Sequence, residues 1–112
     1  MILNTRDENG ITIAQILIQE ANLTQADALK AEMVAIIDKH PKKILTDFSQ
    51  VQYVDSSFLG AMVSSLKYAV ANKADIAVVN LPKDIHDLFA LIRLDKVFKI
   101  YTSVEEALAD SN

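Results

Sequence analysis

One short stretch of the sequence places an acid and two hydroxyls between apolar runs: YVDSSFLGAM, residues 53–62. A hydroxyl beside a carboxylate at the start of a helix can cap the helix, accept a phosphoryl group or act as a nucleophile. Capping is the plainest interpretation, because Asp and Ser are preferred N-caps and one cap stabilises a helix by about 1 kcal/mol. However, Asp55, Ser56 and Ser57 supply more capping groups than one helix needs.

The sequence gives little support for a catalytic nucleophile. The segment DSSFL lacks the flanking glycines of the G-x-S-x-G turn that exposes a catalytic serine. Only His40 and His86 could serve as a base, and both are expected on other helices. Two isolated histidines do not make a metal site, and no glycine-rich phosphate loop is present. We therefore predict no catalytic residues, no metal site and no cofactor, in a protein that is not an enzyme.

The elements that must position these side chains follow from apolar periodicity. Asn9-Gly10 lies between two β-rich runs and predicts a hairpin, since both residues tolerate positive φ. Strands are predicted in residues 2–6, 11–18, 42–49, 75–80 and 96–101. Helices are predicted in residues 25–39, 57–72, 82–92 and 103–110. Capping boxes are expected at Thr24 with Asp27 and at Ser103 with Glu106.

The resulting order, β-β-α-β-α-β-α-β-α, predicts an α/β fold with a mixed, mostly parallel sheet. The opening hairpin would add an antiparallel edge strand. We expect a single domain spanning residues 1–112, which is an ordinary domain size. The Asp55-Ser56-Ser57 turn would then lie beyond the carboxyl end of a strand, where sites gather in open α/β sheets.

The helix predicted for residues 57–72 has two different faces. Its apolar stripe is expected to consist of Leu59, Met62, Val63, Leu66 and Val70. The opposite face begins with small residues and comprises Ser57, Gly60, Ala61, Ser64, Lys67 and Tyr68. Small side chains would let another protein approach closely, but part of this face could equally pack within the domain. Phe58 borders the stripe and could be either a core residue or an exposed anchor.

The composition limits the partners. Net charge is −4, from 11 basic and 15 acidic residues, with no basic cluster. Binding to nucleic acid or to anionic membranes is therefore not expected, because both need clustered Lys and Arg. Cysteine is absent, which suits a reducing compartment, and neither a leader sequence nor a membrane-spanning run is recognisable. We expect a cytoplasmic protein that is a monomer or a weak dimer.

Two segments resemble a known family. The segment DFSQVQYVDSSFLGAMVSSLKYA, residues 47–69, resembles the core motif of STAS domains, the family of anti-sigma factor antagonists. Asp47, Val54, Leu59 and Gly60 match that motif together with the Asp-Ser-Ser turn. The segment LDKVFKIYTSVEEAL, residues 94–108, resembles the ending of the family's sequence. The element order agrees as well, so the resemblance covers nearly the whole chain.

The resemblance implies partner switching. It places a phosphorylated serine at Ser56, with Ser57 as second choice. The kinase would be an anti-sigma factor with serine kinase activity, which the unphosphorylated protein binds, releasing a sigma factor. A serine phosphatase would restore the binding form. The residues implied to contact the partner are Asn22, Leu23, Asp55, Ser57, Phe58, Gly60, Ala61 and Ser64.

The sequence departs from the family pattern at three positions. Phe58 stands where the family has its first motif glycine, Gln19 replaces a glycine before a loop acid, and Asn22 replaces that acid. A phenylalanine beside the phosphoacceptor could narrow kinase access or anchor a partner. The alternative function is a constitutive protein-binding STAS subunit of another assembly, such as a stressosome-like scaffold, a secretion-control switch or a lipid-transport accessory protein.

Overall fold

The computed structural model describes residues 1–110, and a five-stranded sheet with the strand order β1-β2-β4-β6-β7 forms its centre. The strands of this sheet are β1 (Leu3–Glu8), β2 (Ile11–Ile16), β4 (Lys43–Asp47), β6 (Ile76–Val79) and β7 (Lys99–Tyr101). β1 is antiparallel to β2, and the remaining pairs are parallel. The predicted α/β class, element order and antiparallel edge are therefore confirmed.

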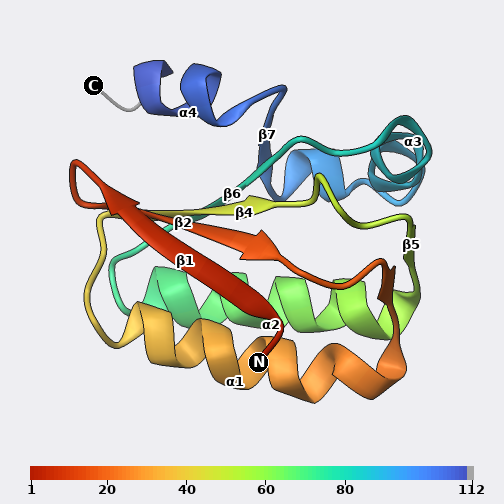
Figure 1. Cartoon of the computed structure of the whole chain (residues 1–112), viewed down its shortest axis with the longest axis horizontal. Coiled ribbons are helices and arrows are strands. Elements are labelled where there is room, and N and C mark those ends of the chain that lie inside the picture. Colours follow the sequence, from red (N-terminus) through yellow and green to blue (C-terminus); the bar gives the residue numbers. More distant parts are fainter. Residues whose placement is uncertain (111–112) are drawn as a thin grey trace.

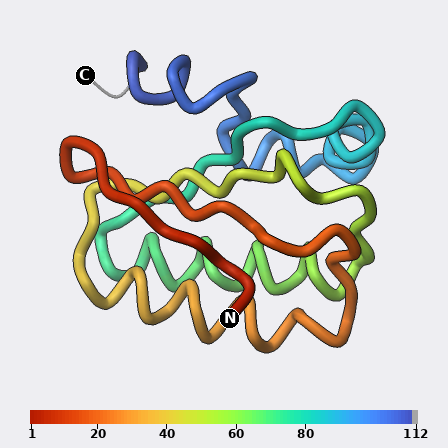
Figure 2. The backbone as a smooth tube through the Cα atoms, in the orientation of Figure 1, coloured from red at the N-terminus to blue at the C-terminus, as the bar shows by residue number. Residues whose placement is uncertain are grey.

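Helices cover both faces of this sheet (Figure 1). α1 (Leu23–Ile37) and α2 (Ser56–Ala71) lie side by side below it in this view, with their N-termini at the same end of the molecule. Above the sheet lie α3 (Lys83–Leu91), a 3-10 turn η1 (Leu94–Lys96) and α4 (Val104–Asp110). The tube in Figure 2 shows how the chain crosses between these layers. The last two residues of the expected domain, 111 and 112, lie outside the described part of the chain.

Alternation along the strands divides the apolar residues into two cores, because successive side chains point to opposite faces. Ala14, Ile16 and Ile44 face α1 and α2 in the larger core, which extends to α3. Ile13 and Leu45 belong to a smaller core that includes residues of α4. All four residues of β6 are buried, which is typical of a parallel strand covered on both faces.

The predicted apolar stripe of α2 is confirmed at Leu59 and Met62 but shifted in phase elsewhere. Val70 is 60% exposed, and Val63 and Leu66 are only partly buried. The buried residues of α2 are Phe58, Leu59, Met62, Ser65 and Ala69. α2 packs against the sheet and α1 together, so the buried arc includes small and polar residues that a hydrophobicity count assigns to the surface.

Two helix ends also differ from the prediction. α1 is capped by Asn22 with Gln25, not by Thr24 with Asp27. Ile92, the last residue of the helix predicted over 82–92, is the C-cap of α3 and is exposed. In both cases the helix begins or ends one to two residues from the expected position, which is the usual uncertainty at helix ends.

The corrected phase of α2 predicts that Phe58→Ala will be far more destabilising than Val70→Ala. Phe58 is fully buried, and truncating a buried phenylalanine costs about 3 to 5 kcal/mol. Val70 is mostly exposed, so its truncation should change the free energy of unfolding by less than about 0.5 kcal/mol. Urea denaturation of both variants measures the difference. Equal losses would contradict the observed packing of α2.

Three polar side chains, Lys99, Tyr101 and Asp110, hold α4 against the sheet and are here called the latch. The Tyr101 hydroxyl donates to Asp110 Oδ2, and Lys99 Nζ lies 3.0 Å from the same oxygen. The hydrogen bond from Tyr101 and then Lys99 lower the pKa of Asp110 below its ordinary value. At the other end of α4, Ser103 Oγ accepts from Glu106 N at 3.1 Å, and Glu106 Oε1 accepts from Thr102 N at 2.9 Å. The predicted Ser103–Glu106 cap is thus present, with Glu106 reaching one residue further back.

The latch predicts an acid-dependent contribution to stability. A carboxyl whose pKa is lowered by folding stabilises the folded state above its unfolded pKa, and the contribution is lost as pH falls through the folded value. Wild type should therefore exceed Asp110→Asn in stability at pH 7. The difference should shrink below about pH 3.9, the ordinary aspartate pKa. Thermal melts of the two proteins between pH 2 and pH 7 measure it; a difference that grows in acid would contradict the latch.

Candidate functional site

A second, two-stranded sheet brings the starts of α1 and α2 together. β3 (Glu20–Ala21) pairs in parallel with β5 (Tyr53–Val54), with Ala21 opposite Val54. Asp55 N extends the pairing by donating to Ala21 O at 3.0 Å. Each of these short strands leads into a helix, so the two helix N-termini lie next to each other at the right of Figure 1.

The side chain of Asp55 links these two helix starts. Its Oδ1 accepts from Phe58 N at 2.9 Å, which makes Asp55 the N-cap of α2. Its Oδ2 accepts from Leu23 N, the first residue of α1, also at 2.9 Å. The carboxylate is thus shared by two sets of free backbone N–H groups, where the helix dipoles favour negative charge.

Asn22 caps α1 from the other side of this junction. Its Oδ1 accepts from Thr24 N at 2.9 Å and from Thr24 Oγ1 at 2.6 Å. Its own backbone N–H donates to Gln25 Oε1 at 3.1 Å, completing a capping box. Asn22 therefore has a structural role that needs no charge, since the carboxylate of the junction comes from Asp55.

Of the three capping candidates in the turn, Asp55 is the cap and neither serine is. Ser56 and Ser57 are the first two residues of α2; Ser56 is exposed and Ser57 is half-buried. Within residues 1–110, no hydrogen bond involves either hydroxyl, and none joins Ser56 to Asp55. Because Asp55 takes the capping role, both hydroxyls are left for other contacts.

The predicted contact residues of α2 separate into different environments. Phe58 is fully buried in the larger core, so its side chain cannot touch a partner, and that assignment is corrected. Ala61 is partly buried against the same core. Gly60 is exposed, and a Cβ added there would meet no atom within 4 Å. Of these three, Gly60 alone lies fully on the outer surface.

Ser64 takes part in a row of side-chain hydrogen bonds between α1 and α2. Lys30 Nζ of α1 donates to Ser64 Oγ at 2.6 Å and to Ser64 O at 3.0 Å. Farther along, Tyr68 OH donates to Asp38 Oδ1 at 2.6 Å, which raises the pKa of Tyr68. Ser64 is exposed but already bound within the domain, as one interpretation of the small face of α2 allowed.

Two exposed apolar side chains flank the junction. Leu23, at the start of α1, is 68% exposed, and Tyr53, on β5, is 55% exposed. Leu23 was among the expected contact residues, but Tyr53 was not. The alternation in β5 was available as a signal, since Val54 is buried and Tyr53 points the other way. A two-residue strand is too short for that pattern to be noticed in a sequence.

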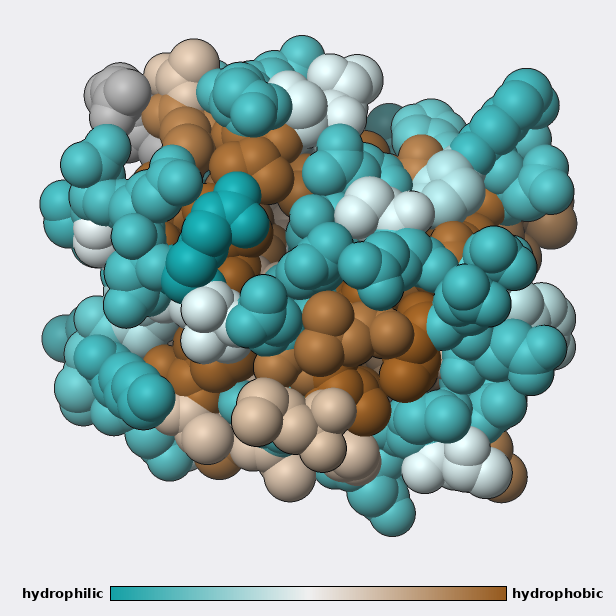
Figure 3. All heavy atoms as spheres, in the orientation of Figure 1, coloured by the Kyte–Doolittle hydropathy of each residue, from teal (hydrophilic) through white to brown (hydrophobic). Residues whose placement is uncertain are grey.

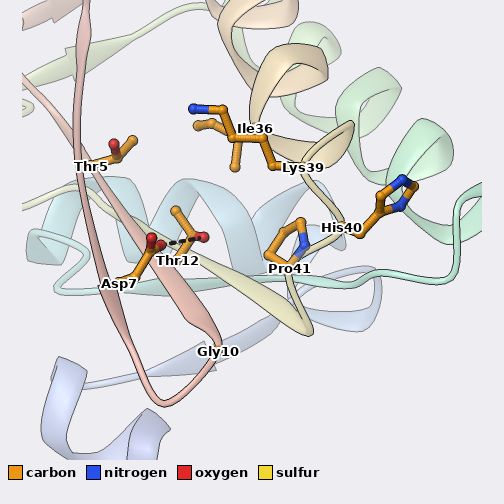
Figure 4. A pocket seen from close by; sticks show the side chains of 8 residues that line it. All are labelled: Thr5, Asp7, Gly10, Thr12, Ile36, Lys39, His40 and Pro41. Atoms are coloured by element: carbon orange, nitrogen blue, oxygen red, sulfur yellow. Dashed lines mark hydrogen bonds between the residues drawn. The ribbon is translucent and has the colours of Figure 1, made fainter.

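The histidines do not complete a catalytic site with Ser56. His40 follows the C-terminal end of α1, opposite the end where Ser56 lies. It lines a hollow of about 250 Å³ under the hairpin, where its ring points away from the Asp7–Thr12 hydrogen bond (Figure 4). His86 lines a different cavity, beside β7. Among the described residues no histidine side chain is hydrogen-bonded to a serine.

No group of three or more His, Cys, Asp or Glu side chains is placed to hold a metal ion within residues 1–110. Over the same range, the helices are too short or too polar to cross a membrane.

A family model covers most of this architecture. The STAS domain model matches residues 7–107. The chain belongs to the STAS domain family. Among its relatives is a Thermotoga maritima protein assigned by its name to the anti-sigma factor antagonists, 28% identical over 93 residues, or 82% of each chain. A Bordetella bronchiseptica protein, BtrV, with the same assignment is 23% identical over 88 residues, covering 79% of this chain and 76% of its own.

Solved structures share the fold. The crystal structure of the Thermotoga maritima protein TM1081 has a TM-score of 0.85 at 24% identity, covering 96% of this chain and 92% of its own. The unphosphorylated form of the anti-sigma factor antagonist SpoIIAA has a TM-score of 0.72 at 14% identity, covering 97% and 96%. The phosphorylated form of SpoIIAA, from Bacillus, also has a TM-score of 0.72. At these identities the likeness concerns the fold alone.

The double cap predicts a graded loss of stability at Asp55. Asp55→Asn keeps an oxygen for Phe58 N or for Leu23 N but loses one of the two bonds. Asp55→Ala loses both. One lost cap costs about 1 kcal/mol, so the expected losses are about 1 and about 2 to 3 kcal/mol. Urea denaturation at neutral pH measures them, with Ser57→Ala as a control of small effect. An Asp55→Asn protein as stable as wild type would show that one oxygen suffices.

Proposed function

We propose that this STAS domain is an anti-sigma factor antagonist that works by partner switching at Ser56. In the unphosphorylated form it binds an anti-sigma factor with serine kinase activity, and a sigma factor is released. Phosphorylation of Ser56 by that kinase ends the binding, and a serine phosphatase reverses the modification. The protein is then a regulator without catalytic residues, acting in the cytoplasm where sigma factors act.

The single observation that carries the proposal is that Asp55 caps α2 and so leaves the Ser56 hydroxyl without a hydrogen bond. Asp55 fills the N-cap of α2 with hydrogen bonds at 2.9 Å, while Ser56 is exposed with its hydroxyl unbound. A kinase needs a hydroxyl that it can reach without unfolding the helix. Ser57 meets this requirement less well, because its side chain is half-buried.

The burial of Phe58 removes the main sequence objection to phosphorylation. A phenylalanine where the family has glycine would obstruct a kinase if its ring stood on the surface. The ring is fully buried in the core, so it does not cover Ser56. The same burial excludes Phe58 as a partner anchor. Tyr53, which is exposed on the β3–β5 junction, is the better candidate, since tyrosine is enriched among the side chains that carry most of the binding energy at interfaces, and the exposed Leu23 lies at the same junction.

A phosphate on Ser56 would weaken the binding of the partner and leave the fold intact. A phosphoserine adds about −1.5 to −2 charges at neutral pH. The N-terminus of α2 tolerates this charge, because its first N–H groups and its dipole favour anions. A docked partner must desolvate the phosphate or oppose it, and each 1.4 kcal/mol of that cost, roughly, weakens binding tenfold.

The proposal predicts that phosphate incorporation depends on Ser56 and that partner binding depends on its charge. Ser56→Ala should abolish incorporation from ATP and the cognate kinase while keeping the fold and binding. Ser56→Asp should keep the fold and weaken binding at least tenfold. Mass-spectrometric site mapping and isothermal titration calorimetry measure the two effects. Phosphate on Ser57 alone would move the switch by one residue and contradict the assignment.

Two matched surface variants separate docking from folding. Gly60→Arg adds a side chain into open space beside Ser56 and should block docking without a change in the thermal melt. Val70→Asp alters an equally solvent-facing position at the far end of α2 and should leave binding intact. Binding without any phosphorylation would instead support a constitutive STAS subunit of another assembly.

A further inference from the structure

α4 covers its part of the sheet with few side chains. Only Val104 and Ala107 of this helix are buried, and Leu108 is partly buried against the same core. By comparison, α1 buries five side chains, most of them large. A helix of seven residues does not persist by itself, because isolated helices shorter than about 12 residues are marginal in water. α4 is therefore helical only while it is packed on the sheet.

The surface under α4 is apolar. α4 contacts β4 and β7, the strands on either side of β6, so it lies across β6 (Figure 1). The buried side chains that the strands contribute to the smaller core are Ile11, Ile13, Leu45, Ala77, Val79 and Tyr101, and every other member of this core belongs to α4. In Figure 3, hydrophobic residues are visible at and just below the position of α4. If α4 were detached, this face of the sheet would be open to water.

A single carboxylate holds the last turn of α4. Asp110 accepts from the Tyr101 hydroxyl, and Lys99 Nζ lies 3.0 Å from the same oxygen. Lys99 and Lys43 each place Nζ 5.8 Å from the centroid of the Tyr101 ring. The carboxylate of Asp110 is thus held by one hydroxyl and attracted by two cations, which come from β7 and β4. The latch therefore joins the C-terminal end of α4 to the edge and the centre of the sheet.

We propose that α4 is a detachable cover, which opens while the rest of the domain stays folded and which the latch holds closed. A segment opens locally when its release breaks far fewer contacts than global unfolding does. α4 meets this condition, since the larger core lies on the other face of the sheet and contains no residue of α4. The open form would expose Ile13, Leu45 and Val79 as an apolar surface, on the side opposite the Ser56 turn. The inference does not depend on the proposed function.

Cysteine labelling measures this opening directly, because the chain has no cysteine of its own. Ala77, on β6 in the smaller core, and Ala14, on β2 in the larger core, are both fully buried. A thiol at either position reacts only when its side of the sheet opens, since the reagent needs an exposed thiolate. Ala77→Cys should react with a disulfide reagent at least about a hundredfold faster than Ala14→Cys. Equal rates would show that α4 detaches only when the whole domain unfolds, and would overturn the proposal.

Hydrogen exchange of the unmodified protein is a second measurement, which needs no substitution. The amides of residues 107–110 should exchange through an opening that depends weakly on urea, because little surface is exposed when α4 detaches. The amides of β4, the central strand, should exchange by global unfolding with its full urea dependence. The same urea dependence for both segments would contradict a local opening.

Two variants of α4 separate the latch from the rest of the helix. Asp110→Asn keeps the size of the side chain but removes the charge that Lys99 contacts, so it should speed the labelling of Ala77→Cys about tenfold. Glu105→Gln removes the same charge from the exposed first turn of α4 and should change the rate less than about threefold. Equal acceleration by both variants would overturn the role assigned to Asp110.

Discussion

The carboxylate of Asp55 is the constraint on which the functional end of the molecule depends. It accepts from the third N–H of α2 and from the first N–H of α1, both at 2.9 Å. The helices are neighbours beneath the sheet, but only at this point does one side chain fix both of their starts. The β3–β5 pairing aligns the two chain segments, and Asp55 N continues that pairing to Ala21 O. Backbone and side chain of one residue thus set the relative position of two helices.

This arrangement has a consequence for the serines that follow. At a helix N-terminus, a hydroxyl or carboxylate normally accepts a hydrogen bond from a free backbone N–H group and so acts as the cap. Here Asp55 is that group, so a serine at the first helical position is held rigidly yet remains unbound. A charge added to Ser56 would lie at the positive end of α2, which offsets part of its repulsion by Asp55. Under the proposed function, the fold would therefore tolerate a phosphate on Ser56 that a docked partner would have to desolvate or oppose.

The sequence was sufficient for the main helices and the five-stranded sheet, but not for β3 and β5 or for the contacts between elements. The Asn9-Gly10 hairpin signal and the apolar periodicity of each segment predicted the five-stranded sheet, because both depend on residues that are close in sequence. The phase of α2 was missed because Ser65 and Ala69 are buried between sheet and α1 while Val70 is not. The Asp55–Leu23 bond joins residues 32 positions apart. No local pattern encodes such a contact, although the capping potential of Asp55 was visible.

The start of α2 and the end of α3 lie on opposite sides of the sheet. Ser56 begins a helix below the sheet, whereas residues 91–97 follow α3 above it. The aromatic contacts of Phe89 with Phe48 and Phe98, at 5.9 and 6.3 Å between ring centroids, join α3 to the end of β4 and to the approach to β7. Phe89 thus holds α3 to the same core that contains residues of α1 and α2.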